Sequence, residues 1–154
     1  MRLTESIFQN LKEDDEWKVK YEAKKKAEKE FAESIDPEPL FDKIREMVGD
    51  NSLQFRFELK EDRGQIYPKV TTDNVVDKCG IFQLAIKECY IGTFSTGIAF
   101  SDKDEEEANW SNPFWWGSID LSYSSHSGGS NGMEILRFNY KKDGGWDFRE
   151  SRGR

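Results

Sequence analysis

The stretch DPEPLFDKIREMVGDNSLQFRFEL, residues 36–59, decides the fold because it contains the change from helical to strand-like spacing. Its first part predicts a helix over 37–48, with Asp36 as the N-cap, Pro37 at the first position and Gly49 as the stop. The apolar residues of this helix follow helical spacing: Leu40, Phe41, Ile44, Met47 and Val48. Over residues 53–59 apolar and polar residues alternate instead, which is the period of a half-buried strand.

Residues 1–50 are expected to form a helical N-terminal region. A long, mostly polar helix precedes the 37–48 helix, and its thin apolar stripe consists of Trp17, Tyr21, Ala27, Phe31 and Ile35. The acidic run 12–16 either interrupts this helix or crosses its polar side, and the lysine run 24–26 is interpreted as a solvated face. A helix of this composition either projects from the body or presents a narrow stripe to a neighbour.

Residues 51–150 are expected to form an antiparallel β domain packed on the 37–48 helix. The segments expected as strands are 53–59, 65–70, one or two strands within 81–100, 116–124, 133–140 and 146–150. Pro68 indicates that 65–70 is an edge strand, and Asp143-Gly144 predicts a hairpin turn. The expected fold class is α+β, with N-terminal helices followed by an antiparallel sheet of about five to seven strands and a frayed tail at 151–154.

Composition disfavours several classes of protein. The net charge of −7 over 154 residues disfavours a general polyanion binder. The chain has no apolar run of about 18 residues and no secretory signal at its start, so we expect a cytoplasmic protein without a membrane span. Cys79 and Cys89 are expected to be reduced, packed thiols, although a disulfide stays open, and no metal site or other cofactor is expected.

The only histidine, His126, lies in the stretch SSHSGGSNG, residues 124–132. A Ser–His pair is a feature of nucleophilic catalysis, but sequence neighbours rarely reach triad geometry and no G-x-S-x-G elbow is present. The glycines also lack the Gly-Lys-Ser/Thr sequence of a phosphate loop. The stretch is therefore interpreted as a hairpin loop, and no catalytic residue is assigned. A small hydrolase that uses His126 or the carboxylates stays open as an alternative.

The candidate partner-binding residues form an acidic run that ends at a tryptophan: Asp102, Asp104, Glu105, Glu106, Glu107 and Trp110. The spacing of the first acids imitates a calcium loop, but the turn glycine and the twelfth-position glutamate are missing. The run is either a solvated loop or a negatively charged face that docks on a basic groove, with the tryptophan as an interface anchor.

The C-terminal segment reverses the overall charge, because residues 137–154 contain six basic and three acidic residues. Basic residues alternate there with aromatic ones, as they do on sheets that bind single-stranded nucleic acid. The candidate nucleic-acid-binding residues are Lys141, Lys142, Trp146 and Arg149. No RNP signature is present, and burial of the aromatic rings in the core is an equally good interpretation.

The opening LTESIFQNLKE, residues 3–13, resembles the start of small accessory proteins of phages and conjugative elements in Gram-positive bacteria. Some of these are anti-CRISPR proteins, which inhibit CRISPR-associated nucleases. The resemblance implies a non-enzymatic inhibitor in the cytoplasm of a bacterial host, and its partner would be a host defence nuclease or the guide-RNA complex of that nuclease. It carries over no site residue. Together with the acidic run, it predicts an acidic protein that blocks a basic nucleic-acid channel.

Overall fold

The structure is a computed structural model that describes the backbone of residues 2–73, 89–124 and 130–151, and the side chains of 16–73, 89–122 and 132–151. Two helices at the N-terminus precede a six-stranded sheet in which every neighbouring pair is antiparallel. The expected α+β class is therefore confirmed. His126 and Cys79 lie outside the described residues, while Cys89 is fully buried.

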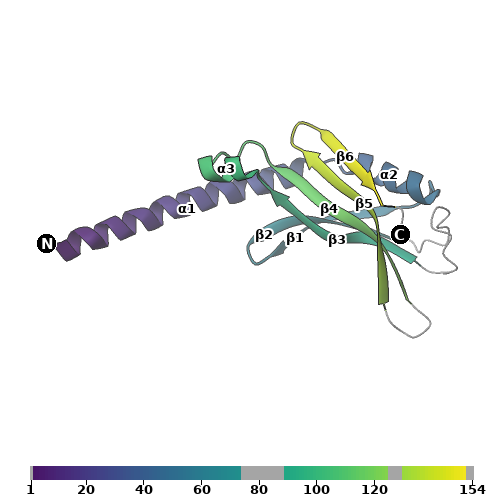
Figure 1. Cartoon of the computed structure of the whole chain (residues 1–154), viewed down its shortest axis with the longest axis horizontal. Coiled ribbons are helices and arrows are strands. Elements are labelled where there is room, and N and C mark those ends of the chain that lie inside the picture. Colours follow the sequence, from purple (N-terminus) through teal and green to yellow (C-terminus); the bar gives the residue numbers. More distant parts are fainter. Residues whose placement is uncertain (1, 74–88, 125–129, 152–154) are drawn as a thin grey trace.

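Helix α1, Arg2–Ser34, is continuous, so the acidic run at 12–16 does not interrupt it. Its N-terminal part projects well beyond the sheet, and its C-terminal part lies against the body of the molecule (Figure 1). The expected apolar stripe divides accordingly. Phe31 and Ile35 are buried, whereas the side chains of Trp17 and Tyr21 are 64% and 42% exposed.

Helix α2, Glu38–Val48, buries the five apolar side chains that the sequence predicts to face the core. Gly49 ends the helix with a left-handed φ of 73°, a conformation that glycine adopts without strain. The helix begins one residue later than expected, because Pro37 occupies the N-cap position. Asp36 still caps it in effect, since its Oδ1 accepts a hydrogen bond from the backbone N–H of Glu38 at 3.1 Å.

The sheet has the strand order β1-β2-β3-β4-β5-β6. The strands are β1 Phe55–Asp62, β2 Gln65–Thr72, β3 Cys89–Ala99, β4 Phe114–Ser124, β5 Ser130–Lys141 and β6 Gly145–Glu150. The expectation that 65–70 is an edge strand is wrong, because β1 occupies the edge. Strand β2 meets β3 only near its end, at Thr71 opposite Gly92. Pro68 lies before this point, where it interrupts no ladder to β3.

Two register shifts bend the central strands. One lies between Thr93 and Ser95 of β3, and it leaves Phe94 as an inserted residue that is 79% exposed. The other places Ile119 opposite Leu136 but Asp120 opposite Glu134, so residue 135 is the extra residue of β5. The described part of residues 81–100 forms a single bulged strand, which is one of the two alternatives predicted for that segment.

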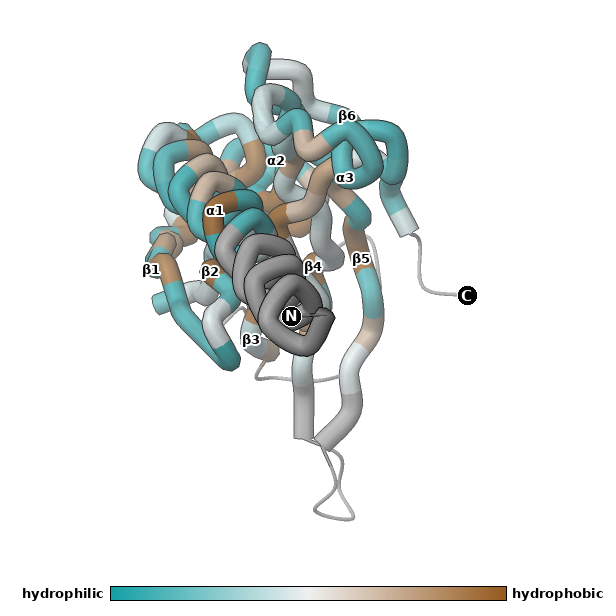
Figure 2. The backbone as a smooth tube through the Cα atoms, turned by 90° about the vertical axis from the view of Figure 1, so that its left-hand side faces the viewer, coloured by the Kyte–Doolittle hydropathy of each residue, from teal (hydrophilic) through white to brown (hydrophobic). Residues whose placement is uncertain are grey.

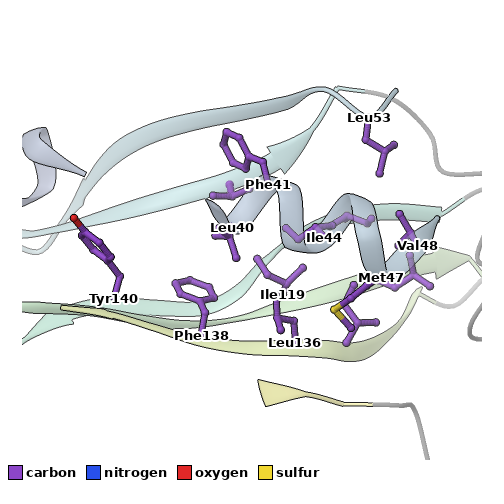
Figure 3. Close-up of a cluster of buried hydrophobic side chains, with 14 of the residues drawn as sticks. Leu40, Phe41, Ile44, Met47, Val48, Leu53, Ile119, Leu136, Phe138 and Tyr140 are labelled. Atoms are coloured by element: carbon purple, nitrogen blue, oxygen red, sulfur yellow. The ribbon is translucent and has the colours of Figure 1, made fainter. Parts of the chain in front are cut away.

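The core lies between α2 and the curled sheet. In Figure 3, α2 runs between the first strands of the sheet on one side and β4 and β5 on the other, and Ile119 and Phe138 point from these strands toward α2. Hydrophobic positions gather in the same central region in Figure 2. Fully buried Trp115 completes the core, and its Nε1 donates a hydrogen bond to Thr96 Oγ1 at 2.6 Å.

The chain end is partly held by the sheet. The backbone N–H of Ser151 donates to the carbonyl oxygen of Ile135 at 2.9 Å, which satisfies the bulge residue of β5. The first residue of the expected frayed tail is therefore ordered by a hydrogen bond, and residues 152–154 lie outside the described residues.

Candidate protein-binding surface

The acidic run forms helix α3, Asp102–Glu107, so the solvated loop, one of the two interpretations of this run, is wrong. Ser101 is the N-cap, and its hydroxyl accepts a hydrogen bond from the backbone N–H of Asp104 at 3.2 Å. Carboxylates in the first turn stabilise a helix because they face the positive end of its dipole. Ala108 ends the helix in the left-handed region, with φ 50°. This short helix fixes the directions in which the acidic side chains point.

Asp104 differs from the other acidic residues because it is only 9% exposed. It lines a cavity of about 410 Å³ together with Asn139, Lys141 and Lys142. The backbone N–H of Lys142 donates to Pro113 O at 3.3 Å, which ties the tip of the β5–β6 hairpin to the segment after α3. Residues from the predicted acidic and basic sites therefore meet at one end of the sheet, and Asp104 is not part of the outward-facing acidic surface.

The remaining acidic residues of α3 are exposed, and one of them connects α3 to α1. Lys24 Nζ lies 2.6 Å from Glu105 Oε1, and it also lies 5.4 Å from the centre of the Trp110 ring. Trp110 in turn packs edge-on against buried Phe100, with their ring centres 5.1 Å apart. The expectation of a fully solvated lysine face is therefore wrong at Lys24. Lys26 is exposed as expected, with its ammonium 3.9 Å from Glu30.

Two aromatic residues of α1 extend this contact into a larger surface. Trp17 and Tyr21 stack with ring centres 5.3 Å apart, and both line a shallow cavity of about 240 Å³ between α1 and α3. The cavity also involves Glu105, Glu106 and Trp110. We call this group the α1–α3 surface, and Figure 1 shows α3 beside the middle of α1. The sequence suggested Trp110 and the acidic residues, but it assigned Trp17 and Tyr21 to a packing stripe.

A buried carboxylate lies one helical turn further along α1. Glu28 is 6% exposed, and its Oε2 lies 3.6 Å from Lys25 Nζ. Burial raises the pKa of Glu28, while the nearby charges of Lys25 and Lys24 partly offset that rise. Lys25 is half-buried beside Glu28, so the expectation of a solvated lysine face is wrong at this second member of the lysine run as well.

The C-terminal hairpin exposes its charges and packs its aromatic rings inward. Lys141, Lys142 and Arg149 are exposed. Trp146 lies 4.5 Å from the ring centre of Tyr140 and packs against the core, as Phe148 does. A platform for nucleobases needs open ring faces. The faces of these rings instead pack against one another.

Comparisons with models of known families, with curated proteins and with solved structures give no match for this chain. Of the helices that the structure describes, none has both the length and the apolar composition that crossing a bilayer requires. Within the described ranges, no three His, Cys, Asp or Glu side chains gather as they would around a metal ion.

Proposed function

We propose that this protein is a non-enzymatic binding protein whose α1–α3 surface docks on a Lys/Arg-rich surface of a partner protein. The observation that carries the proposal is the placement of an indole that is 64% exposed, Trp17, beside the acidic helix α3. Large aromatic side chains anchor interfaces, and charges of one sign steer the approach of a partner with the opposite charge. Both features lie on one surface here.

The charges of α3 set the kind of partner. Glu105 already has an ion pair with Lys24, so it gains less from a new cation than exposed Glu106 and Glu107 do. A carboxylate that is buried in an interface costs free energy unless a cation meets it. The partner surface must therefore supply arginine or lysine side chains at the spacing of these two carboxylates.

Nucleic-acid-binding grooves have this chemistry, because they are lined with cations that pair with phosphates. The resemblance of residues 3–13 suggests which grooves to test first, namely those of host defence nucleases and their guide-RNA complexes. In this proposal the protein inhibits the nuclease by occupying the groove, and it competes directly with the nucleic acid.

The test is binding to a panel of purified CRISPR-associated nucleases, with and without guide RNA, combined with DNA cleavage assays. Trp17→Ala should weaken binding about tenfold or more, as expected for loss of an interface anchor. It should leave folding intact, because alanine is the better helix former at an exposed position.

Val19→Ala is the matched control. Val19 is 66% exposed on the same helix but does not line the cavity between α1 and α3. Residues two apart on a helix point in different directions, so this variant should bind as the wild type does. Equal binding by both variants, or no binding to any member of the panel, would contradict the proposal.

A further inference from the structure

The open face of the sheet, which points away from α2, contains a third cavity. Trp115 points into the core, so its neighbour Trp116 points to the opposite face and is 39% exposed. The cavity has a volume of about 450 Å³, and its lining includes Phe94, Trp116, Ser118, Asp120, Glu134 and Arg137. It lies on β3, β4 and β5 and shares no lining residue with the cavity between α1 and α3.

Local backbone features shape this cavity. The bulge in β3 directs Phe94 outward, where it is the most exposed of the large apolar side chains that the structure describes. Gly97, opposite Trp116, allows the indole to lie flat against the strand, since a Cβ at this position would lie only 3.1 Å from Cζ2 of the ring. Two aromatic side chains therefore form an apolar part of the cavity.

The polar part of the cavity contains one carboxylate with an unmet hydrogen-bonding group. Asp120 Oδ1 is buried and accepts no hydrogen bond from any side chain or backbone group in the described part of the chain. Across the ladder from it, Glu134 Oε1 accepts a hydrogen bond from Arg137 Nε at 2.6 Å. Arg137 is thus engaged by Glu134. Burial, and to a lesser extent the charge of Glu134, raises the pKa of Asp120.

We propose that this cavity binds an organic cation, an ammonium or guanidinium group on an apolar stem. The cation donates a hydrogen bond to Asp120 Oδ1, and the stem lies against Trp116 and Phe94. The two sources of this chemistry are a small aromatic amine or amidine and an arginine or lysine side chain of a peptide. This cavity lies on a face of the molecule that the proposed function does not use.

Charge complementarity favours an organic cation over an anion and over a neutral apolar ligand. An anion would lie against the carboxyl groups of both Asp120 and Glu134, while the guanidinium of Arg137 is already engaged by Glu134. A neutral apolar ligand would bury the Asp120 carboxylate further without pairing it, which costs free energy. A cation pairs with the carboxylate and also gains from the face of the indole ring.

The experiment titrates the full chain with two probes, benzamidine and Nα-acetyl-arginine amide, and follows the five tryptophan indole signals by NMR and the heat by calorimetry. The signal of Trp116 is assigned with Trp116→Phe. Benzamide, which has nearly the shape of benzamidine without its charge, is the neutral comparison. Benzamide should bind at least about tenfold more weakly than benzamidine, because a hydrogen bond between charged groups is stronger than one from a neutral donor.

Asp120→Asn should weaken benzamidine binding about tenfold for the same reason. The matched control is Asp147→Asn, because Asp147 is an exposed carboxylate of β6 that does not line the cavity. This variant should bind benzamidine as the wild type does. Phe94→Ala serves as a second test, since a side chain that is 79% exposed can be removed with little effect on folding. It should weaken binding of both probes.

The outcomes are distinct. Stronger binding of benzamidine than of the arginine derivative supports a small aromatic cation, and the reverse order supports a peptide side chain. Benzamide binding as tightly as benzamidine, unchanged affinity in Asp120→Asn, or no shift of the Trp116 signal with either probe would overturn the proposal. Unchanged nuclease binding in Trp17→Ala would contradict the proposed function without affecting the benzamidine titration, so failures of the two proposals are distinguishable.

Discussion

Replacing Lys24 by methionine tests whether the α1–α3 contact holds the acidic helix in place. The ammonium of Lys24 pairs with Glu105 at 2.6 Å, and the two side chains are 30% and 40% exposed. An ion pair with this exposure contributes about 0.5 kcal/mol after solvent screening. The position of the ammonium 5.4 Å from the Trp110 ring adds about 0.5 kcal/mol. Methionine keeps an apolar stem, so Lys24→Met should lower the free energy of unfolding by about 1 kcal/mol.

The assay is urea denaturation of Lys24→Met, Glu105→Gln and the double variant, at low salt. The cycle should give a coupling energy of about 0.5 kcal/mol between the two positions. Lys26→Met is the matched control, because Lys26 and its partner Glu30 are 79% and 67% exposed and 3.9 Å apart. It should change stability by at most about 0.3 kcal/mol. Equal effects of Lys24→Met and Lys26→Met, with zero coupling in the cycle, would refute the reasoning.

Three further variants test the core and the buried charge. Ile44→Ala, at a fully buried position of α2, should cost about 3 kcal/mol in urea denaturation, and a cost below about 1 kcal/mol would exclude this packing. Gly117→Ala should cost about 2 kcal/mol, because the new Cβ would lie 2.7 Å from the Phe138 ring, whereas Gly145→Ala meets no atom and should be neutral; equal thermal stability would contradict this. Glu28→Gln should stabilise the protein at neutral pH. Because its pKa is raised, the Glu28 carboxyl group contributes to the stability of the folded state at low pH, and this contribution is lost as pH rises through that pKa. The stability advantage of glutamine should therefore shrink as the pH falls. A constant difference in stability in urea titrations across acidic pH would contradict this reasoning.

The elements with strong periodicity could be predicted from the sequence. The apolar positions of α2 follow helical spacing because one face of that helix is buried, and all five are buried in the structure. Phe55 and Phe57 alternate with polar residues for the corresponding reason in a strand. These patterns depend on local geometry, so they give element type and inward face directly.

The arrangements that depend on distant contacts could not be predicted. Helix α3 contains no apolar residue, so periodicity cannot indicate it, although Ser101 followed by acidic residues is a helix-start signal. The ion pair of Lys24 with Glu105 depends on how α1 crosses the sheet, and no local pattern contains that information. The position of β2 inside the sheet likewise depends on its pairing with β3, whereas Pro68 indicated only that one side of the strand lacks a ladder.

The acidic surface itself was predicted in composition but not in extent. Glu105 and Glu106 line one cavity together with Trp110, but Asp104 lines a different cavity with Lys141 and Lys142. Helix α1 continues past the edge of the sheet (Figure 1), and the side chain of Trp17, which is 64% exposed, lines the cavity between α1 and α3. An exposed apolar residue at helical spacing has the same sequence pattern as a buried one, so only the structure separates the two groups.

The rate at which the protein associates with a partner of the proposed kind, a nuclease with a basic nucleic-acid groove, measured against salt concentration, tests the central claim most directly. Wild type should associate quickly at low salt and slow steeply as salt is added. The double reversal Glu106→Lys with Glu107→Lys should be slower by about tenfold at low salt and should lose most of the salt dependence. An unchanged rate and an unchanged salt dependence in the reversed variant would show that the partner does not meet the acidic face of α3.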